Sequence, residues 1–66
     1  MIVVPPIVAD YVKYTTLAKI GKKKVTRLRN ASLRDRVWQE MNSDAQWLAV
    51  DILSGDVVKY RVATDE

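Results

Sequence analysis

The sequence of 66 residues is long enough for one domain with a modest core, and it contains neither cysteine nor histidine, which excludes disulfide bonds and the usual structural zinc sites. Its 48% of hydrophobic and 29% of charged residues are typical of a folded globular domain, whereas its longest apolar stretch is broken by two prolines and is too short to cross a membrane. The net charge is a modest +3, and we expect a cytoplasmic protein that needs no metal ion or other cofactor.

The N-terminal third predicts an extended arm followed by a β-hairpin. Pro5 and Pro6 favour an extended arm over residues 1–6 of a single domain that fills positions 1–66. The segment Ile7–Ile20 is rich in β-branched residues and tyrosine, with partial alternation of apolar side chains, as in a half-buried strand. Gly21-Lys22 would form a tight turn, and Lys23–Arg29 would return as the second strand.

The same segment also allows two helices. Asp10 would then cap a helix over Tyr11–Ile20 that stops at Gly21, and Val25 and Leu28 would lie on a second helix. We favour the hairpin.

The middle of the chain carries the clearest local pattern. Ser32-Leu33-Arg34-Asp35 has the form of a capping box, with Asp in place of Glu. Leu33, Val37 and Met41 then recur at the spacing of one apolar helix face. This pattern predicts an amphipathic helix from about Leu33 to Asn42, ended by the turn-forming sequence Asn42-Ser43-Asp44.

The C-terminal third predicts a second β-hairpin, formed by Gln46–Leu53 and Val57–Ala63 around the loop Ser54-Gly55-Asp56. In this register Asp51 faces Lys59, and a longer loop would shift it. The fold class is therefore α+β, with an N-terminal hairpin, one helix at about 33–42 and a C-terminal hairpin. The predicted core consists of Val12, Ile20, Val25, Leu33, Val37, Met41, Val50, Ile52, Val58, Tyr60 and Val62.

The sequence offers no catalytic site. It has no cysteine or histidine to act as nucleophile or base, and its two glycines cannot form a phosphate-binding loop. Glu40 and Asp44 are a close pair of acids, which we interpret as exposed helix-surface residues. We therefore predict a binding protein and not an enzyme.

The strongest functional signal is a basic region. Residues 19–36 carry eight Lys and Arg against one acid, a charge of +7, while the rest of the chain carries −4. On a hairpin these side chains would form a ribbon that neutralises the phosphates of DNA or RNA, or else a solvated edge that prevents aggregation. The predicted contacts are Lys22, Lys23, Lys24, Arg27, Arg29 and Arg34.

One segment resembles a known DNA-binding motif. The run Thr15-Thr16-Leu17-Ala18-Lys19-Ile20-Gly21, followed by Lys24-Val25-Thr26-Arg27-Leu28, is similar to the helix-turn-helix of small phage excisionase-type regulators. The interval between Ala18 and Gly21 is one residue shorter than in that motif. The resemblance implies nucleic-acid binding, with the later hairpin as a wing.

Other functions remain open. Trp38 and Trp47 are expected to anchor the core or an interface, while Tyr11, Tyr14 and Tyr60 are placed for base stacking or half-buried on a sheet. The alternatives to nucleic-acid binding are a protein-binding module or small inhibitor of the phage or plasmid type, which engages an acidic or apolar partner, and a self-assembling structural subunit. Exposed strand edges and a small core also favour a homodimer.

Overall fold

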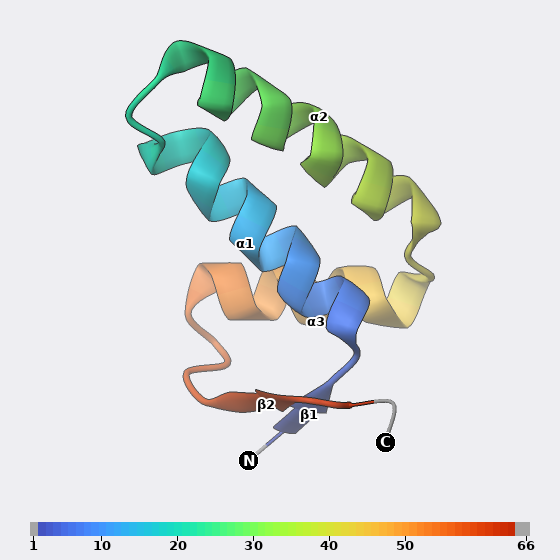
Figure 1. Cartoon of the computed structure of the whole chain (residues 1–66). Helices are drawn as coiled ribbons and strands as arrows, with labels where there is room; N and C mark the ends of the chain where they lie inside the picture. The colour runs from blue at the N-terminus through green and yellow to red at the C-terminus, as the bar shows by residue number, and fades with distance from the viewer. Residues whose placement is uncertain (1, 65–66) are drawn as a thin grey trace.

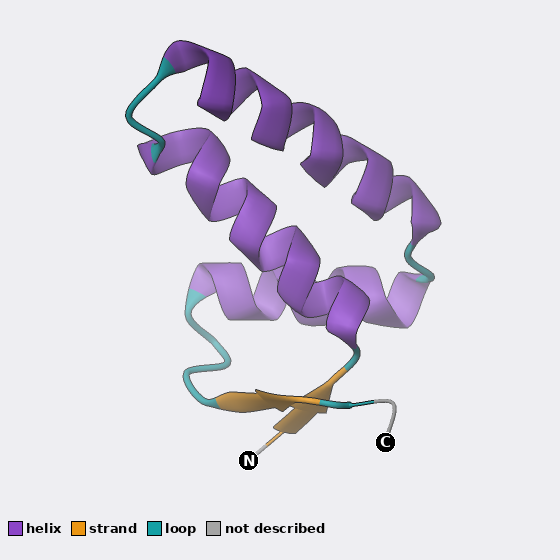
Figure 2. Cartoon of the chain, viewed as in Figure 1, coloured by secondary structure: helices purple, strands orange, loops and turns teal. Residues whose placement is uncertain are grey.

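The protein folds as three helices closed at one end by a pair of short strands (Figure 1). The computed structural model describes residues 2–64, so Met1 of the predicted arm lies outside them. Helices α1 and α2 run side by side in opposite directions, and α3 lies across α1 next to the strands (Figure 2). In chain order the elements are β1 (Ile2–Val4), α1 (Pro6–Ile20), α2 (Lys24–Glu40), α3 (Ser43–Ser54) and β2 (Tyr60–Val62).

The predicted fold of two β-hairpins and one helix is wrong, and its first hairpin is a helical hairpin. Helix α1 begins at Pro6, where proline is favoured because its fixed φ suits the first helical residue and its missing N–H needs no partner. β-Branched residues cost a helix only a few tenths of a kcal/mol each, roughly up to 0.7 relative to alanine. Burial of Val8 in the core, with Ile7 and Tyr11 of the same helix packed against it, outweighs that cost. The alternative of two helices was closer, although the first begins before Asp10.

The second predicted hairpin is also wrong. Gln46–Leu53 lies within α3, which starts at the N-cap residue Asn42, where the sequence predicts a simple turn. The side-chain oxygen of Asn42 accepts a hydrogen bond from the backbone N–H of Ala45 at 2.8 Å, which satisfies a donor in the first helical turn. At the other end Gly55 adopts a left-handed φ of 92°, a conformation that glycine takes at little cost.

The two strands, which are the first and last elements of the described chain, pair with each other. β1 and β2 are parallel, with Ile2 opposite Tyr60 and Val4 opposite Val62, so the predicted pairing of Asp51 with Lys59 does not form. Parallel strands need a long crossover, and the three helices supply it. The predicted helix at 33–42 is the second half of α2, and Ser32 lies inside that helix instead of capping it.

The core lies where β1, the start of α1, the end of α2 and α3 meet. Its buried members are Val4, Val8, Met41, Ala45 and Ala49. Of the predicted core, Met41 is confirmed, and Val37, Ile52 and Tyr60 pack against the cluster. Those with exposed side chains are Ile20, Val25, Val50, Val58 and Val62.

The predicted core failed because it assumed alternating strand faces. In a strand every second side chain faces the core, whereas in a helix the buried side chains recur every three or four residues. The core is thus confined to one end of the molecule, and the α1–α2 turn projects from the opposite end (Figure 1). Within residues 2–64 no helix is long and apolar enough to cross a membrane.

Candidate nucleic-acid interface

Three lysines cluster at the turn between α1 and α2. Lys22 and Lys23 form the turn, Lys24 is the first residue of α2, and all three side chains are exposed. We call Lys22, Lys23 and Lys24 the lysine tip. The turn lies at the end of the helical hairpin away from the core (Figure 1), which is consistent with the exposure of all three residues.

The turn is held by a close backbone approach at Gly21. Its N–H donates to the carbonyl oxygen of Leu17 at 2.9 Å and closes α1. A Cβ at position 21 would lie 2.7 Å from that carbonyl oxygen, closer than real Cβ contacts. Glycine is therefore required here for space, and it fixes where the lysine tip begins.

The half-buried side chain of Arg27 supports this turn. Its guanidinium Nη1 donates to the carbonyl oxygens of Gly21, at 2.8 Å, and Lys22, at 3.3 Å. These bonds satisfy carbonyl groups just after the end of α1. The structure thus gives Arg27 a part in holding the turn, whereas its predicted contact with phosphate stays a prediction.

The N-terminus of α2 adds to the positive potential of the lysine tip. The N-cap residue Lys23 makes no side-chain capping bond, and the first turn contains no acidic residue. A helix of this length carries roughly half a positive charge at this end, from its unpaired N–H groups. Three ammonium groups beside that partial charge repel it, and a bound anion would relieve the repulsion.

The arginines of α2 lie on two sides of the helix. Arg29 and Arg36 are exposed and seven residues apart, which places them on one outer face. Arg34 is half-buried, and its guanidinium pairs with the carboxylate of Asp35 at 3.0 Å. It lies about 15 Å along the helix from Lys24, given a rise of about 1.5 Å per residue.

Four of the six predicted contacts, the lysine tip and Arg29, are exposed; the three lysines are consecutive at the turn, and Arg29 lies five residues after Lys24 in α2. Arg27 and Arg34 face other groups. The predicted contacts omit two further exposed basic residues, Lys19 in the last turn of α1 and Arg36 in α2. A helical period applied to residues 24–40 would have paired Arg36 with Arg29.

Apolar side chains are exposed at the same end of the helical hairpin. Ile20 ends α1 with 70% of its surface exposed, and Val25 and Leu28 lie in the first part of α2. These residues cannot contribute to the core, which lies at the other end of the helices. The positively charged lysine tip is therefore bordered by exposed apolar side chains.

The aromatic residues are largely committed to packing. The rings of Tyr11 and Trp38 are tilted against each other with centroids 5.2 Å apart, and Tyr60 packs against the core. Tyr14 is half-buried beneath the ammonium group of Lys13, 6.0 Å from the ring centroid. Trp47 is different, because 69% of its surface is exposed on α3, away from the lysine tip.

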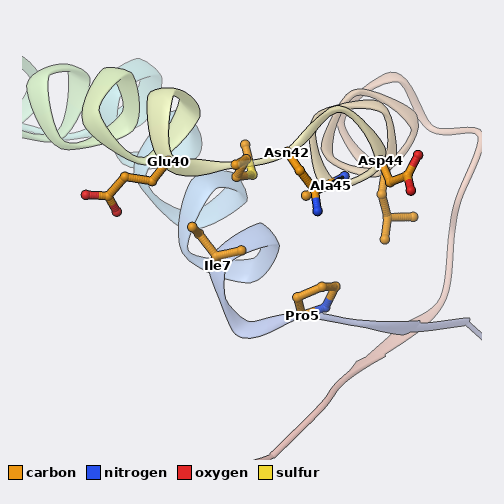
Figure 3. A pocket seen from close by; sticks show the side chains of 8 residues that line it. Pro5, Ile7, Glu40, Asn42, Asp44 and Ala45 are labelled. Atoms are coloured by element: carbon orange, nitrogen blue, oxygen red, sulfur yellow. Dashed lines mark hydrogen bonds between the residues drawn. The ribbon is translucent and has the colours of Figure 1, made fainter.

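The acid pair Glu40 and Asp44 does not converge on a shared point. The two residues flank the junction of α2 and α3 beside a cavity of about 300 Å³, and Figure 3 shows their carboxylates directed apart. Residues 2–64 contain no group of three or more acidic side chains placed to hold a metal ion. Because these two acids would repel phosphate, the cavity does not belong to the candidate nucleic-acid interface.

The helix-turn-helix resemblance is not matched by the arrangement of the helices. In that motif two helices cross at about 90–120°, whereas α1 and α2 run alongside each other as a hairpin (Figure 1). The predicted wing is occupied by α3.

Comparison with protein-family models, with curated proteins and with solved structures finds no match to this chain.

Proposed function

We propose that this protein binds nucleic acid through the lysine tip and Arg29, as an accessory or regulatory factor. The observation that carries the proposal is the clustering of three exposed ammonium groups at the uncapped N-terminus of α2. Phosphate is the anion that suits this arrangement, because helix N–H groups donate to its oxygens while lysines neutralise its charge.

The binding is expected to be mainly electrostatic. Lysine contacts phosphate as a point charge, and contacts with phosphate carry no sequence information. Four neutralised phosphates would give a slope of about −3.6 for log K against log salt on duplex DNA. Affinity should therefore fall roughly 100-fold between about 50 and 200 mM salt.

The test is a fluorescence-anisotropy titration against labelled duplex DNA, single-stranded DNA and RNA at these two salt concentrations. The variant Lys22→Ala/Lys23→Ala/Lys24→Ala removes the lysine tip. A matched variant, Lys13→Ala/Lys59→Ala/Arg61→Ala, removes the same charge from exposed positions outside the tip. Circular dichroism would establish that both variants stay folded.

We expect the tip variant to lose most of the affinity and to reduce the salt slope to about −1, while the matched variant keeps a slope near that of the parent. Equal losses in the two variants would show non-specific attraction by net charge and would contradict the proposed site. No binding at low salt to any of the three nucleic acids would contradict the function itself.

A second candidate is the binding of an acidic protein. The exposed Ile20, Val25 and Leu28 beside the lysine tip favour it, because apolar contacts add nothing to phosphate binding but do stabilise a protein interface. Leu28→Ser distinguishes the two candidates. It should leave binding to nucleic acid unchanged, and it should weaken binding to an acidic amphipathic helical peptide.

A further inference from the structure

The outer face of α3 is an apolar seam that no other described element covers. Ser43, Trp47, Val50 and Ser54 are all exposed and follow each other at intervals of four, three and four residues. At about 100° per residue these positions lie within an arc of about 60° along the helix. We call these four residues the α3 seam. The opposite side of α3 carries the core residues Ala45 and Ala49.

The four residues of the α3 seam are uncharged, and the polar side chains of Gln46 and Ser54 at this face are already hydrogen-bonded. The two ionisable residues of α3, Asp44 and Asp51, flank the seam on one side, about 60° and 40° around the helix from Trp47. The side-chain amide of Gln46 donates to the carbonyl oxygen of Trp38 at 2.9 Å, and the hydroxyl of Ser54 donates to that of Asp51 at 3.1 Å. Burial of the seam itself would therefore leave Gln46 and Ser54 satisfied, provided that the carboxylate of Asp51 stays at the solvent-exposed edge.

The exposed area of the chain exceeds that of a typical monomer of its size. The accessible surface is 5037 Å², whereas a compact protein of this mass exposes about 4,200 Å². The excess of about 800 Å² is close to what each partner buries in an interface of standard size. Among the exposed apolar side chains of α3, Trp47 is the most exposed, with 69% of its surface accessible.

We propose that the α3 seam is the interface of a symmetric homodimer, in which α3 of one copy packs antiparallel against α3 of a second copy. A two-fold interface places a surface against itself, so like charges meet; the uncharged seam avoids this repulsion, whereas the lysine tip does not. The symmetry centre falls midway between Trp47 and Val50. Trp47 of each copy therefore lies against Val50 of the other.

The surroundings of the seam fit this arrangement. An open groove of about 320 Å³ runs beside Val50 and is lined by Trp38, Gln46 and Trp47, and it would receive the indole of the second copy. Small serines at both ends of the seam allow the two helices to approach closely. The inference is independent of the proposed function, because the α3 seam and the lysine tip share no residue.

The first test is sedimentation equilibrium of the parent protein and two matched variants. Val50→Glu places carboxylates in the seam, whereas Val25→Glu makes the same change at an exposed valine of α2. We expect the parent and Val25→Glu to dimerise and Val50→Glu to have a dissociation constant at least ten times higher. Circular dichroism would confirm that both variants keep their helix content.

The second test uses single cysteines, since the parent chain has none. Val50→Cys should form an intermolecular disulfide much faster than Ser32→Cys, an exposed position on the outer face of α2. A parent protein that stays monomeric up to about 1 mM, which corresponds to about 4 kcal/mol of association free energy, overturns the proposal. Equal cross-linking rates, or a dimer that Val50→Glu leaves intact, overturn the assignment of this face.

Discussion

The guanidinium Nη1 of Arg27 donates a hydrogen bond to the carbonyl oxygen of Gly21 at 2.8 Å, so a basic side chain in α2 closes the end of α1. Loss of this charge-assisted bond in Arg27→Ala should reduce the free energy of unfolding by about 1–2 kcal/mol. Arg27→Lys should restore only part of it, because a single ammonium group lacks the planar fork of guanidinium. Urea denaturation followed by circular dichroism measures both.

Arg29→Ala is the matched control for Arg27. Its exposed side chain makes no ion pair within residues 2–64, so its removal should change stability by less than about 0.5 kcal/mol. For DNA binding we expect the reverse order of effects. Arg29→Ala should reduce the magnitude of the salt slope by about 1, and Arg27→Ala should leave the slope unchanged. The opposite pattern would contradict the positioning role of Arg27.

Gly21→Ala tests the close approach within the turn. The added methyl group would lie 2.7 Å from the carbonyl oxygen of Leu17 and 3.2 Å from Cγ of Arg27. Because the nearer atom belongs to the backbone, relief requires the end of α1 to shift, at a cost of about 1–3 kcal/mol. Thermal unfolding should show a lower midpoint, and an unchanged midpoint would contradict the described geometry.

The chemistry of the basic end could be predicted from sequence, but its architecture could not. The density of lysines at positions 22–24 and a turn at Gly21 are local features, and both occur in the structure. The choice between strand and helix for the flanking segments is not local. It depends on burial of Val8 against a core to which Met41 and Ala49 contribute from distant parts of the chain.

The role of single side chains depended on that choice. On a strand, Arg27 and Arg29 point the same way, whereas on a helix they lie about 160° apart. Arg27 consequently turns to the carbonyl groups of the turn and Arg29 faces solvent. Likewise, Asn42 reads as a turn residue from sequence, and only the start of α3 reveals it as an N-cap.

Thr15 contains a buried hydroxyl group that is unsatisfied in the described chain. It is 7% exposed on α1, and its Oγ1 has no hydrogen-bond partner within residues 2–64. Thr15→Val replaces the hydroxyl with a methyl group of similar size and removes the cost of burying it. We expect the free energy of unfolding to rise by about 1 kcal/mol, measured by urea denaturation.

Thr16→Val provides the control for this change on the same helix. The hydroxyl of Thr16 is exposed and donates to the carbonyl oxygen of Val12 at 2.9 Å, so its replacement should alter stability by less than about 0.5 kcal/mol. Equal effects of the two variants would indicate a change in helix propensity and not the relief of a buried polar group.

Asn42→Ala tests the cap that starts α3. The variant leaves the backbone N–H of Ala45 without its acceptor at 2.8 Å, and the expected loss of stability is about 1 kcal/mol. Asn42→Asp keeps an acceptor and places a negative charge at the positive end of the helix, so it should retain the stability of the parent. Because the α3 seam begins at Ser43, fraying of the first turn should also weaken dimerisation in Asn42→Ala. Sedimentation equilibrium beside urea denaturation measures both effects, and a stable Asn42→Ala variant that dimerises normally would show that the cap is dispensable.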